Sequence, residues 1–367
     1  MLKRNILLIV GARPNLMKAA PLMEAMSSSA QIQPFLLHTG QHYDTNMSQV
    51  FFDDLGLPKP DYYLGVGSGS HATQTAQIMI AFEPVLIERR PDLVMVVGDV
   101  NSTLACTLVA SKLHVAVAHV EAGLRSFNRR MPEEINRIVT DALSTFLFTT
   151  DRQANENLLR EGIAEDKIDF VGNVMIDTLL KHREQALQLK LLEPLGLVPG
   201  HYAVLTLHRP DNVDHPSILQ RLLKVIGQIS YDLPVIFPIH PRTRRNIEAF
   251  GLTHLLEDFP ALMCRDPLGY LEFLALMAQA KLIITDSGGI QEETTVLGVP
   301  CLTLRAETER PVTVAEGTNI LIGTNTEQLF LEAHRILGGQ GKSGRLPDLW
   351  DGCAAQRIVA RLLEMLN

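Results

Sequence analysis

The sequence predicts an α/β protein of two domains, each built on a Rossmann-like, doubly wound parallel sheet. At 367 residues the chain exceeds the size at which one hydrophobic core usually stops growing, so two domains of roughly 150 to 200 residues are expected. Short apolar runs of strand length alternate with amphipathic segments of helix length, which is the pattern of parallel βαβ units. A turn-rich stretch at 193–200 interrupts this alternation, which then restarts.

Each predicted element follows from an apolar run or from helical spacing. The first half contains six strand candidates, namely Ile6–Val10, Phe35–His38, Leu93–Val97, Val115–Val120, Phe146–Thr149 and Ile168–Val171. The second half contains five, namely Ala203–Leu207, Val235–Ile239, Leu282–Thr285, Cys301–Leu304 and Ile320–Ile322. With a long helix predicted at 175–192, we place the first domain at 1–178 and the second at 179–352, facing each other across a central cleft. The C-terminal segment 353–367 is predicted to form a helix that packs back on the first domain.

Composition and charge exclude several classes of protein. The formal net charge of -8 argues against a nucleic-acid binder, although a local basic cleft for one diphosphate is compatible with it. The four cysteines, Cys106, Cys264, Cys301 and Cys353, form no CxxC pair, so neither a metal site nor a disulfide framework is expected. No apolar run reaches the ~18 residues of a membrane helix, and Ile6–Val10 is too short for a signal-peptide core. We therefore expect a cytoplasmic protein that binds no membrane.

Two cations follow the first predicted strand. In doubly wound sheets, ligands bind outside the carboxyl ends of the strands. The strand runs into Gly11-Ala12-Arg13-Pro14-Asn15-Leu16-Met17-Lys18, where glycine lets the backbone turn and a helix N-terminus favours anions. We predict that Arg13 and Lys18 hold an anion, the alternative being two solvated surface charges. This first loop is not the GxGxxG fingerprint, and the sequence contains no Walker lysine pattern, so NAD and P-loop binding lose support.

Two carboxylates stand at the tips of predicted strands. Asp99 and Glu121 each follow such a strand. If the strands are neighbours, the two acids approach each other, which raises the pKa of at least one and suits a proton donor or base. The alternative is that each caps the following helix, although the loop 123–131 separates Glu121 from the next helix. Glu133 and Glu134 open that helix, where the macrodipole favours carboxylates by about 0.3 to 1 kcal/mol, so structural and chemical roles are equally open for them.

The second half presents histidines at matched strand ends. His208 and Arg209 follow one predicted strand, and His240 with Arg242 follows the next. A lone histidine is usually structural, but two at matched positions beside arginines favour contact with a polar ligand.

The most specific motif is Thr-Asp-Ser-Gly-Gly-Ile-Gln-Glu-Glu at 285–293. It places three small residues at a helix N-terminus, Ser287, Gly288 and Gly289. Their backbone N–H groups would form a cradle for a diphosphate. Glu293, one turn later, offers paired acceptors to the vicinal diol of a ribose. The alternative is a glycine-rich turn with a helix cap, which is disfavoured because arginines, including Arg310, follow the next predicted strand.

Taken together, these segments closely resemble the motifs of the non-hydrolysing UDP-N-acetylglucosamine 2-epimerases, over essentially the whole chain. They occur in order as Gly11-Ala12-Arg13-Pro14 with Lys18, Gly98-Asp99, HVEAGLR at 119–125, PEEINR at 132–137, His208-Arg209, His240-Pro241-Arg242, DSGGIQEE at 286–293 and TERP at 308–311. The resemblance implies a GT-B architecture, a homodimer, and no metal or NAD cofactor. It also implies that the second domain holds most of the nucleotide and the first carries most of the sugar chemistry.

The same resemblance implies a reaction and a set of site residues. The reaction is inversion at C2 of UDP-N-acetylglucosamine through elimination of UDP to a 2-acetamidoglucal and re-addition. The implied acid and base carboxylates are Asp99, Glu121 and Glu133, with His208 near the diphosphate leaving group. The implied substrate contacts are Arg13, Lys18, Arg209, His240, Ser287, Gly288, Gly289 and Arg310, with Glu293 at the ribose and Phe273 at the uracil.

Other functions remain open from the sequence. The loop 125–132 is shorter than the usual one before the paired glutamates, and similar forms occur in relatives that act on UDP-2,3-diacetamido-2,3-dideoxy-glucuronic acid. A GT-B glycosyltransferase would share the nucleotide site but require an acceptor. A hydrolysing epimerase would accumulate free N-acetylmannosamine and UDP, and a nucleotide-sugar sensor would bind its ligand without needing Glu121.

Overall fold

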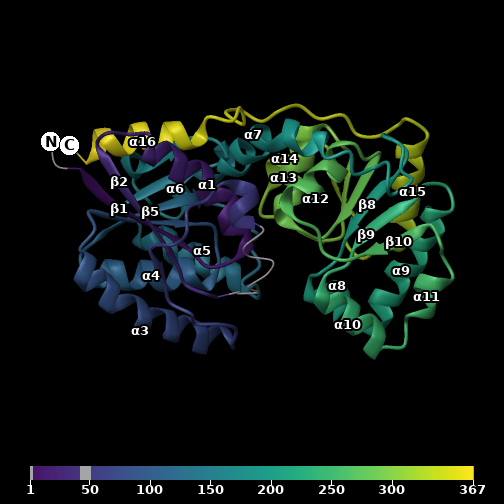
Figure 1. Cartoon of the computed structure of the whole chain (residues 1–367), viewed down its shortest axis with the longest axis horizontal. Coiled ribbons are helices and arrows are strands. Elements are labelled where there is room, and N and C mark those ends of the chain that lie inside the picture. Colours follow the sequence, from purple (N-terminus) through teal and green to yellow (C-terminus); the bar gives the residue numbers. More distant parts are fainter. Residues whose placement is uncertain (1–2, 42–50, 367) are drawn as a thin grey trace. The chain divides into compact units, whose positions relative to one another are not determined.

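The computed structural model describes residues 3–41 and 51–366 (Figure 1). The chain divides into two compact units, which we call unit 1 (Met1–Lys181 with Asp348–Asn367) and unit 2 (His182–Pro347). The predicted boundary after residue 178 and the observed one after Lys181 both fall inside helix α7 (Val174–Gln188), which continues through them.

Unit 1 is built on a parallel sheet. Its seven described strands lie in the order β3-β2-β1-β4-β5-β6-β7. Their bounds are β1 Arg4–Val10, β2 Ile32–His38, β3 Tyr62–Tyr63, β4 Leu93–Val97, β5 Ala116–Ala122, β6 Phe146–Thr149 and β7 Ile168–Phe170. The described helices are α1 Arg13–Ser27, α3 His71–Arg89, α4 Asn101–Lys112, α5 Pro132–Leu143, α6 Arg152–Arg160, the first part of α7, α16 Ala354–Met365 and the 3-10 helix η1 Glu165–Lys167. Every residue of β4 is buried, as expected for a parallel strand covered by helices on both faces.

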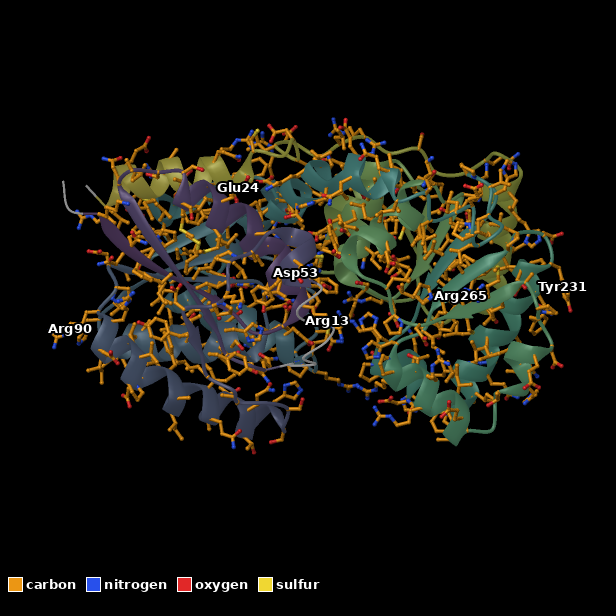
Figure 2. All side chains as sticks on the ribbon, viewed as in Figure 1. Arg13, Glu24, Asp53, Arg90, Tyr231 and Arg265 are labelled. Atoms are coloured by element: carbon orange, nitrogen blue, oxygen red, sulfur yellow. The ribbon has the colours of Figure 1, made fainter. Side chains whose placement is uncertain are left out.

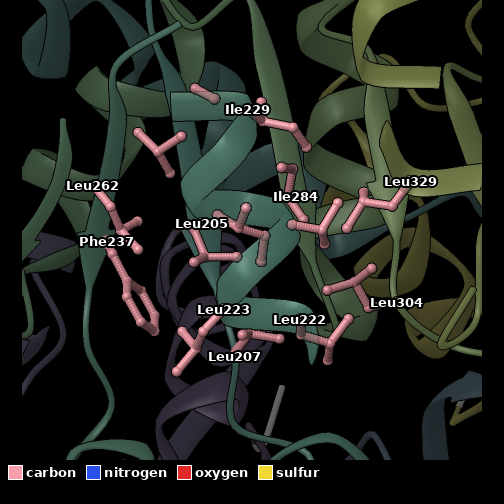
Figure 3. Packing of buried hydrophobic residues seen from close by; sticks show 14 of the residues in the cluster. Leu205, Leu207, Leu222, Leu223, Ile229, Phe237, Leu262, Ile284, Leu304 and Leu329 are labelled. Atoms are coloured by element: carbon pink, nitrogen blue, oxygen red, sulfur yellow. The ribbon is translucent and has the colours of Figure 1, made fainter. Parts of the chain in front are cut away.

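Unit 2 repeats the plan with a smaller sheet. Its six described strands lie in the order β10-β9-β8-β11-β12-β13. Their bounds are β8 Ala203–Thr206, β9 Val235–Pro238, β10 Leu262–Arg265, β11 Leu282–Thr285, β12 Cys301–Thr303 and β13 Asn319–Leu321. The helices are α8 Pro210–Val213, α9 Pro216–Ser230, α10 Pro241–Ala249, α11 His254–Glu257, α12 Tyr270–Ala278, α13 Gly288–Leu297, α14 Pro311–Ala315 and α15 Thr326–Leu337. In the core, Leu222 and Leu223 of α9 belong to the same buried cluster as Phe237 of β9 and Ile284 of β11 (Figure 3).

All eleven predicted runs form strands, and two described strands are missing from the prediction. β3 has only two residues, too few for an alternating pattern. β10 is an edge strand in which only Leu262 is fully buried, so its apolar signal is weak.

The strand orders fix where each unit presents its functional loops. In unit 1 the order reverses between β1 and β4, and in unit 2 it reverses between β8 and β11. Chain segments leave neighbouring strands in opposite directions at such a switch point, and the crevice at their carboxyl ends is where doubly wound sheets bind ligands. A ligand is therefore expected to contact the loops that follow β1 and β4 in unit 1 and β8 and β11 in unit 2.

The C-terminal helix is part of unit 1, where α16 packs against α1 (Figure 1). The carboxylate of Asp177, on α7, accepts hydrogen bonds from the backbone N–H groups of Ala354 (3.1 Å) and Ala355 (2.7 Å). Asp177 therefore provides acceptors for two backbone N–H groups at the start of α16 that have no partner within the helix. The indole of Trp350 donates to the carbonyl of Thr150 at 2.9 Å. This anchor explains why unit 1 resumes at Asp348, a few residues before the predicted 353.

Over the described ranges 3–41 and 51–366, no helix is long and apolar enough to cross a membrane.

Candidate active site

The loop after β1 delivers a buried lysine to a buried glutamate. Lys18, on α1, is 4% exposed and its ammonium forms an ion pair with the carboxylate of Glu121, which is 3% exposed. The Lys18 Nζ atom also lies 3.0 Å from the position that a Cβ on Gly98 would occupy. Gly98 has φ +67, so both the backbone and the close approach of Lys18 require glycine there. The alternative of a solvated surface charge is wrong for Lys18.

Arg13 opens the same helix at the edge of the loop. Its side chain, labelled in Figure 2, is half-buried, and its guanidinium carbon lies 5.8 Å from the centroid of the Phe51 ring. This is within the distance of a cation–π contact. The two predicted anion-binding cations thus lie in different environments, since Lys18 is buried against a carboxylate.

Glu121 has an unusual backbone. Its φ is +75, a left-handed conformation that costs a non-glycine residue on the order of 1 to 3 kcal/mol. The register between β5 and β6 shifts between Val120 and Ala122, so Glu121 occupies a bulge. Such bulges re-aim a side chain and are frequent beside active sites. Strained residues and bulges are frequent at functional sites, so this backbone is consistent with the prediction for Glu121.

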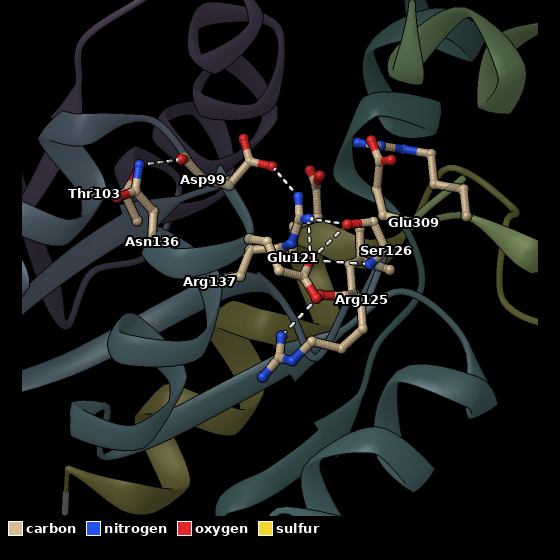
Figure 4. Close-up of polar contacts among 12 residues, drawn as sticks. Asp99, Thr103, Glu121, Arg125, Ser126, Asn136, Arg137 and Glu309 are labelled. Carbon is tan, nitrogen blue, oxygen red and sulfur yellow. Dashed lines mark hydrogen bonds and ion pairs between the residues drawn. The ribbon is translucent and has the colours of Figure 1, made fainter. Parts of the chain in front are cut away.

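Asp99 follows β4, next to β5 in the sheet, and faces an arginine (Figure 4). Its carboxylate accepts a hydrogen bond from Arg137 at 2.5 Å, and its backbone carbonyl accepts one from the Asn136 amide at 2.8 Å. The N-cap of α4 is Val100 and receives no side-chain cap bond. The alternative that Asp99 caps this helix is therefore wrong.

The two glutamates at the start of α5 differ. Glu134 accepts from the backbone N–H groups of Ser126 (2.9 Å) and Phe127 (2.9 Å) and pairs with Arg137. Burial alone would raise the pKa of Glu134, but Arg137 and the Ser126 donors hold it below the usual value. Glu134 thus has a structural role in holding the loop. Glu133 is half-buried, and within the part of the chain that the structure describes no hydrogen bond or ion pair restrains it, which leaves it available for chemistry.

In unit 2, a buried aspartate organises the loop after β8. Asp286, fully buried, accepts from the backbone N–H groups of His208 (3.0 Å) and Arg209 (2.9 Å) and from the Asn212 amide (3.1 Å). Its other oxygen lies 2.9 Å from Nδ1 of His208. Burial would raise the pKa of Asp286, but His208 and these backbone donors lower it. Nδ1 of His208 therefore donates to an ionised carboxylate, and Nε2 is the ring nitrogen left for a ligand.

His240 lies beside His208, with ring centroids 5.9 Å apart. Its Nδ1 accepts the backbone N–H of Arg242 at 3.2 Å, which caps α10. The guanidinium of Arg242 turns to Asp214 at 2.9 Å. The two strand-end histidines therefore lie side by side, whereas Arg242 forms a separate surface ion pair.

The loop after β11 forms an arginine-lined helix N-terminus. The Ser287 N–H donates to the Thr285 hydroxyl at 3.0 Å, and the Ser287 side chain makes no cap bond. The donors left for an anion are therefore those of Gly288 and Gly289 in the first turn. A Cβ on Gly288 would lie 2.6 Å from Nη1 of Arg310. This close approach places a guanidinium against the helix N-terminus, as an anion site requires.

A second buried carboxylate lies one turn along α13. Glu293 is buried, and the Tyr270 hydroxyl donates to its Oε1 at 3.3 Å. Burial raises the pKa of Glu293 to about 8. Tyr270 opens α12, and the half-buried Phe273 follows on the same helix. The predicted ribose and uracil residues thus belong to two packed helices, α12 and α13.

Comparison with known proteins places the chain in one family. The family model described as UDP-N-acetylglucosamine 2-epimerase matches residues 24–363. The chain belongs to the UDP-N-acetylglucosamine 2-epimerase family. It is 45% identical over 357 residues to the UDP-N-acetylglucosamine 2-epimerase of Methanocaldococcus jannaschii, covering 96% of this chain and 97% of that protein. It is also 44% identical over 338 residues to the UDP-2,3-diacetamido-2,3-dideoxy-D-glucuronate 2-epimerase of Pseudomonas aeruginosa, covering 91% and 92%.

Solved epimerase structures agree with the fold. The crystal structure of the M. jannaschii enzyme in complex with UDP-GlcNAc and UDP matches with a TM-score of 0.91 and 44% identity, covering 98% of this chain and 99% of that one. The Neisseria meningitidis enzyme bound to UDP-GlcNAc matches with a TM-score of 0.90 and 30% identity, covering 98% and 100%. The predicted GT-B type α/β fold of two parallel-sheet domains is confirmed.

Several residues that contact the candidate site residues were not predicted from the sequence. Arg137 could have been found because it lies three positions after Glu134 on α5 and so shares its face. Asp286 directly follows β11, as Asp99 follows β4, so the same strand-end argument applies to it. Tyr270 gives no sequence signal, because its link to Glu293 joins two helices that are far apart in the chain. No group of His, Cys, Asp and Glu that could hold a metal ion occurs among the described residues.

Proposed function

We propose that this member of the epimerase family interconverts UDP-N-acetylglucosamine and UDP-N-acetylmannosamine. The observation that supports it most is the 45% identity, over 96% of the chain, to a protein named UDP-N-acetylglucosamine 2-epimerase, whose crystal structure is a complex with UDP-GlcNAc and UDP. Carboxylates at the strand ends of unit 1 and a diphosphate cradle in unit 2 are the chemistry that this reaction needs.

Elimination explains how C2 can be inverted without oxidation. The C2 proton lies beside an acetamido group and not beside a ketone, so its direct removal gives no stabilised carbanion. In the proposed route a carboxylate takes this proton while the C1–O bond to UDP breaks, which gives 2-acetamidoglucal and UDP. Re-addition of UDP to C1, with protonation of C2 on the opposite face, gives the epimer. Atoms and charge balance, and no electron is gained or lost.

Each half of the residue set has a proposed role. Asp99, Glu121 and Glu133 are the proposed acids and bases at C2, and general acid–base groups of this kind contribute about 100- to 10,000-fold. Lys18 and Arg137 orient Glu121 and Asp99 through the ion pairs described above. His208 uses Nε2 toward the leaving diphosphate, because Asp286 already engages Nδ1.

The remaining residues are proposed to bind the substrate. Gly288 and Gly289 offer backbone donors to the diphosphate, beside Arg310. Glu293 accepts from the ribose hydroxyls and Phe273 stacks on the uracil. The further proposed phosphate and sugar contacts are Arg13, Arg209, His240 and Ser287.

Deuterium incorporation tests this function. Purified protein is incubated with UDP-N-acetylglucosamine alone in deuterium oxide and followed by NMR. We expect both UDP epimers, each with solvent deuterium at C2. Glu121→Gln should lower the rate by about 100-fold or more, whereas Glu156→Gln, a matched control at an exposed ion pair on α6, should not change it. Epimerisation without deuterium at C2 would overturn the elimination route.

A second substrate is favoured by one observation. The 44% identity to the P. aeruginosa diacetamido-glucuronate epimerase is nearly as high as that to the M. jannaschii enzyme. The same chemistry at C2 would serve both substrates, so the substituents at C3 and C6 decide between them. Comparing kcat/KM for the two UDP-sugars in the NMR assay identifies the substrate. A value at least about tenfold higher for the uronate would replace the first proposal.

We also propose that the protein is a homodimer. Helix α3 supports this, because its exposed residues Ile80 (72%) and Ile87 (52%) lie about two helical turns apart on one face, and a contiguous exposed apolar patch marks an interaction surface. Light scattering should give twice the chain mass. A monomeric mass at working concentration would refute the dimer without affecting the proposed reaction.

A further inference from the structure

We propose that His119 and Asp141 form a buried positioning pair, which holds the backbone on which Asp99 and Glu121 are mounted. This inference rests on the proposed function, because it concerns the two carboxylates assigned to C2. Neither residue touches the substrate in the proposed mechanism. They act by fixing the positions of the Asp99 and Glu121 carboxylates.

His119 connects the strand that carries Glu121 to the turn that carries Asp99. It lies on β5, two residues before Glu121, and is fully buried. Its Nε2 lies 2.8 Å from the carbonyl oxygen of Gly98, the residue that precedes Asp99. Its Nδ1 lies 2.6 Å from Oδ1 of Asp141, on α5. One imidazole therefore links β5, the end of β4 and helix α5.

Asp141 continues the link to the far side of Glu121. Its Oδ2 accepts the backbone N–H of Gly123 at 3.1 Å and lies 2.7 Å from Nη2 of Arg125. Arg125 in turn pairs with Glu161 at 2.6 Å. The pair thus holds the chain on both sides of Glu121. His119 itself lies two residues before Glu121, and Gly123, whose N–H donates to Asp141, lies two residues after it.

The geometry fixes the orientation of the His119 ring. A carbonyl oxygen can only accept, so Nε2 of His119 carries a hydrogen and donates to Gly98. Besides His119, Asp141 contacts two groups, the Gly123 N–H and the Arg125 guanidinium. Burial would raise the pKa of Asp141, but His119 and Arg125 hold that pKa below the usual value. The buried ring therefore bridges the Asp141 carboxylate and the Gly98 carbonyl.

The backbone that the pair holds contains left-handed conformations, which non-glycine residues rarely adopt. Gly98, Glu121 and Gly123 have φ of +67, +75 and +79, and for the glutamate this costs on the order of 1 to 3 kcal/mol. Such a backbone persists only where surrounding interactions over-determine it. Hydrogen bonds from the pair reach the Gly98 carbonyl and the Gly123 N–H, and the Gly98 N–H donates to Val120 at 3.0 Å. These are the bonds that can hold the bulge.

A purely structural role would not require charge. Replacing a buried ion pair by apolar residues of similar volume is often neutral or stabilising, so stability alone does not explain ionic groups here. Directional bonds to two specific backbone atoms do explain them, because a misplacement of about 1 Å in a catalytic group can cost on the order of 100-fold in rate.

Four variants test the pair in the full chain. His119→Asn keeps a donor near the position of Nδ1 and loses the bond to Gly98, while His119→Gln keeps a donor near Nε2 and loses the bond to Asp141. Asp141→Asn keeps the shape and one acceptor, which guards against loss of the fold. Asp177→Asn is the matched control, since it alters another buried carboxylate with two backbone donors in unit 1.

The measurement is the amount of UDP and 2-acetamidoglucal released per epimer formed. This ratio does not depend on the folded fraction, so a loss of stability alone leaves it unchanged. We expect it to rise about tenfold or more in the His119 and Asp141 variants, because misplaced acids reprotonate the intermediate slowly while its release continues. We also expect kcat to fall far more than KM changes. Asp177→Asn should keep the wild-type ratio.

The outcomes separate the two proposals. If the wild-type protein forms no epimer from either UDP-sugar, the proposed function fails. If the wild-type protein epimerises its substrate and the His119 and Asp141 variants keep its release ratio, the proposed function stands and the positioning pair is refuted.

Discussion

Gly288→Ala is the most direct test of the diphosphate cradle. A Cβ at this position would lie 2.6 Å from Nη1 of Arg310 and 2.8 Å from Oε1 of Glu309. Ordinary contact begins near 3.4 Å, so the guanidinium must move by roughly 0.8 Å. Arg310 cannot do so freely, because its Nε lies 3.0 Å from Glu292 and it also pairs with Glu309.

The expected effect falls on binding more than on stability. Overpacking costs about 1 to 3 kcal/mol, while alanine in place of glycine in a helix returns up to about 1 kcal/mol, so the free energy of unfolding should fall by about 0 to 2 kcal/mol. The displaced guanidinium loses a charge-assisted hydrogen bond to the diphosphate, worth about 1.5 to 3 kcal/mol. The Kd for UDP should therefore rise about 10- to 150-fold.

Isothermal titration with UDP measures this effect. Gly338→Ala is the matched control, because Gly338 follows α15 in the same unit, has φ -72, and its added Cβ would have its nearest neighbour at 3.4 Å. The control should bind UDP as the wild-type protein does. A Kd for Gly288→Ala within about twofold of the control would refute the cradle, since it corresponds to less than about 0.5 kcal/mol.

Three further predictions concern buried groups. Burial raises the pKa of Glu293 to about 8 in the folded protein, against an ordinary value of 4.5. The folded state therefore binds more protons between these values, and stability falls as the pH rises from about 4.5 to about 8. Urea unfolding should show a drop of a few kcal/mol over this range relative to Glu293→Gln, and parallel curves would refute the assignment. Lys18→Met removes the ammonium partner of buried Glu121 and should cost about 3 to 5 kcal/mol in unfolding free energy together with most epimerisation; a variant as stable as the wild-type protein would contradict the ion pair. Trp350→Ala should cost about 3 to 5 kcal/mol and open the chain near Asp348 to limited proteolysis, and an unchanged cleavage pattern would show that this anchor is not needed.

Most of the fold could be predicted from the sequence, because strands and helices each produce a local pattern of apolar residues. Buried parallel strands such as β4 are continuous apolar runs, and each can be recognised without its neighbours. The edge strand β10 gave no such signal, because three of its four residues are only half-buried. The boundary in α7 was displaced because a helix that continues from one unit into the next contains no break to mark the change.

The candidate site was predictable where chemistry follows directly on a strand. Asp99, Glu121 and His208 were predicted in this way, since the carboxyl ends of parallel strands meet at one edge of a sheet. What the sequence could not supply is the partner of each group. Arg137 for Asp99, Lys18 for Glu121 and Tyr270 for Glu293 are joined only by tertiary packing. Each of these two acids also has a cation of its own, Arg137 for Asp99 and Lys18 for Glu121.

In both units, a buried carboxylate contacts the backbone of a loop that carries candidate catalytic side chains. A reactive side chain at a strand end needs a fixed backbone, yet its own loop has too few contacts to fix it. In unit 2, the buried carboxylate of Asp286 accepts hydrogen bonds from the backbone N–H groups of His208 and Arg209. In unit 1, the pair of His119 and Asp141 binds the backbone around Glu121. Because these buried groups hydrogen-bond to the chain itself, we expect changes to them to alter kcat while leaving UDP affinity nearly intact, and changes at Gly288 to do the reverse. Measuring both quantities for both kinds of variant therefore separates the groups that bind the substrate from the groups that keep the catalytic side chains in place.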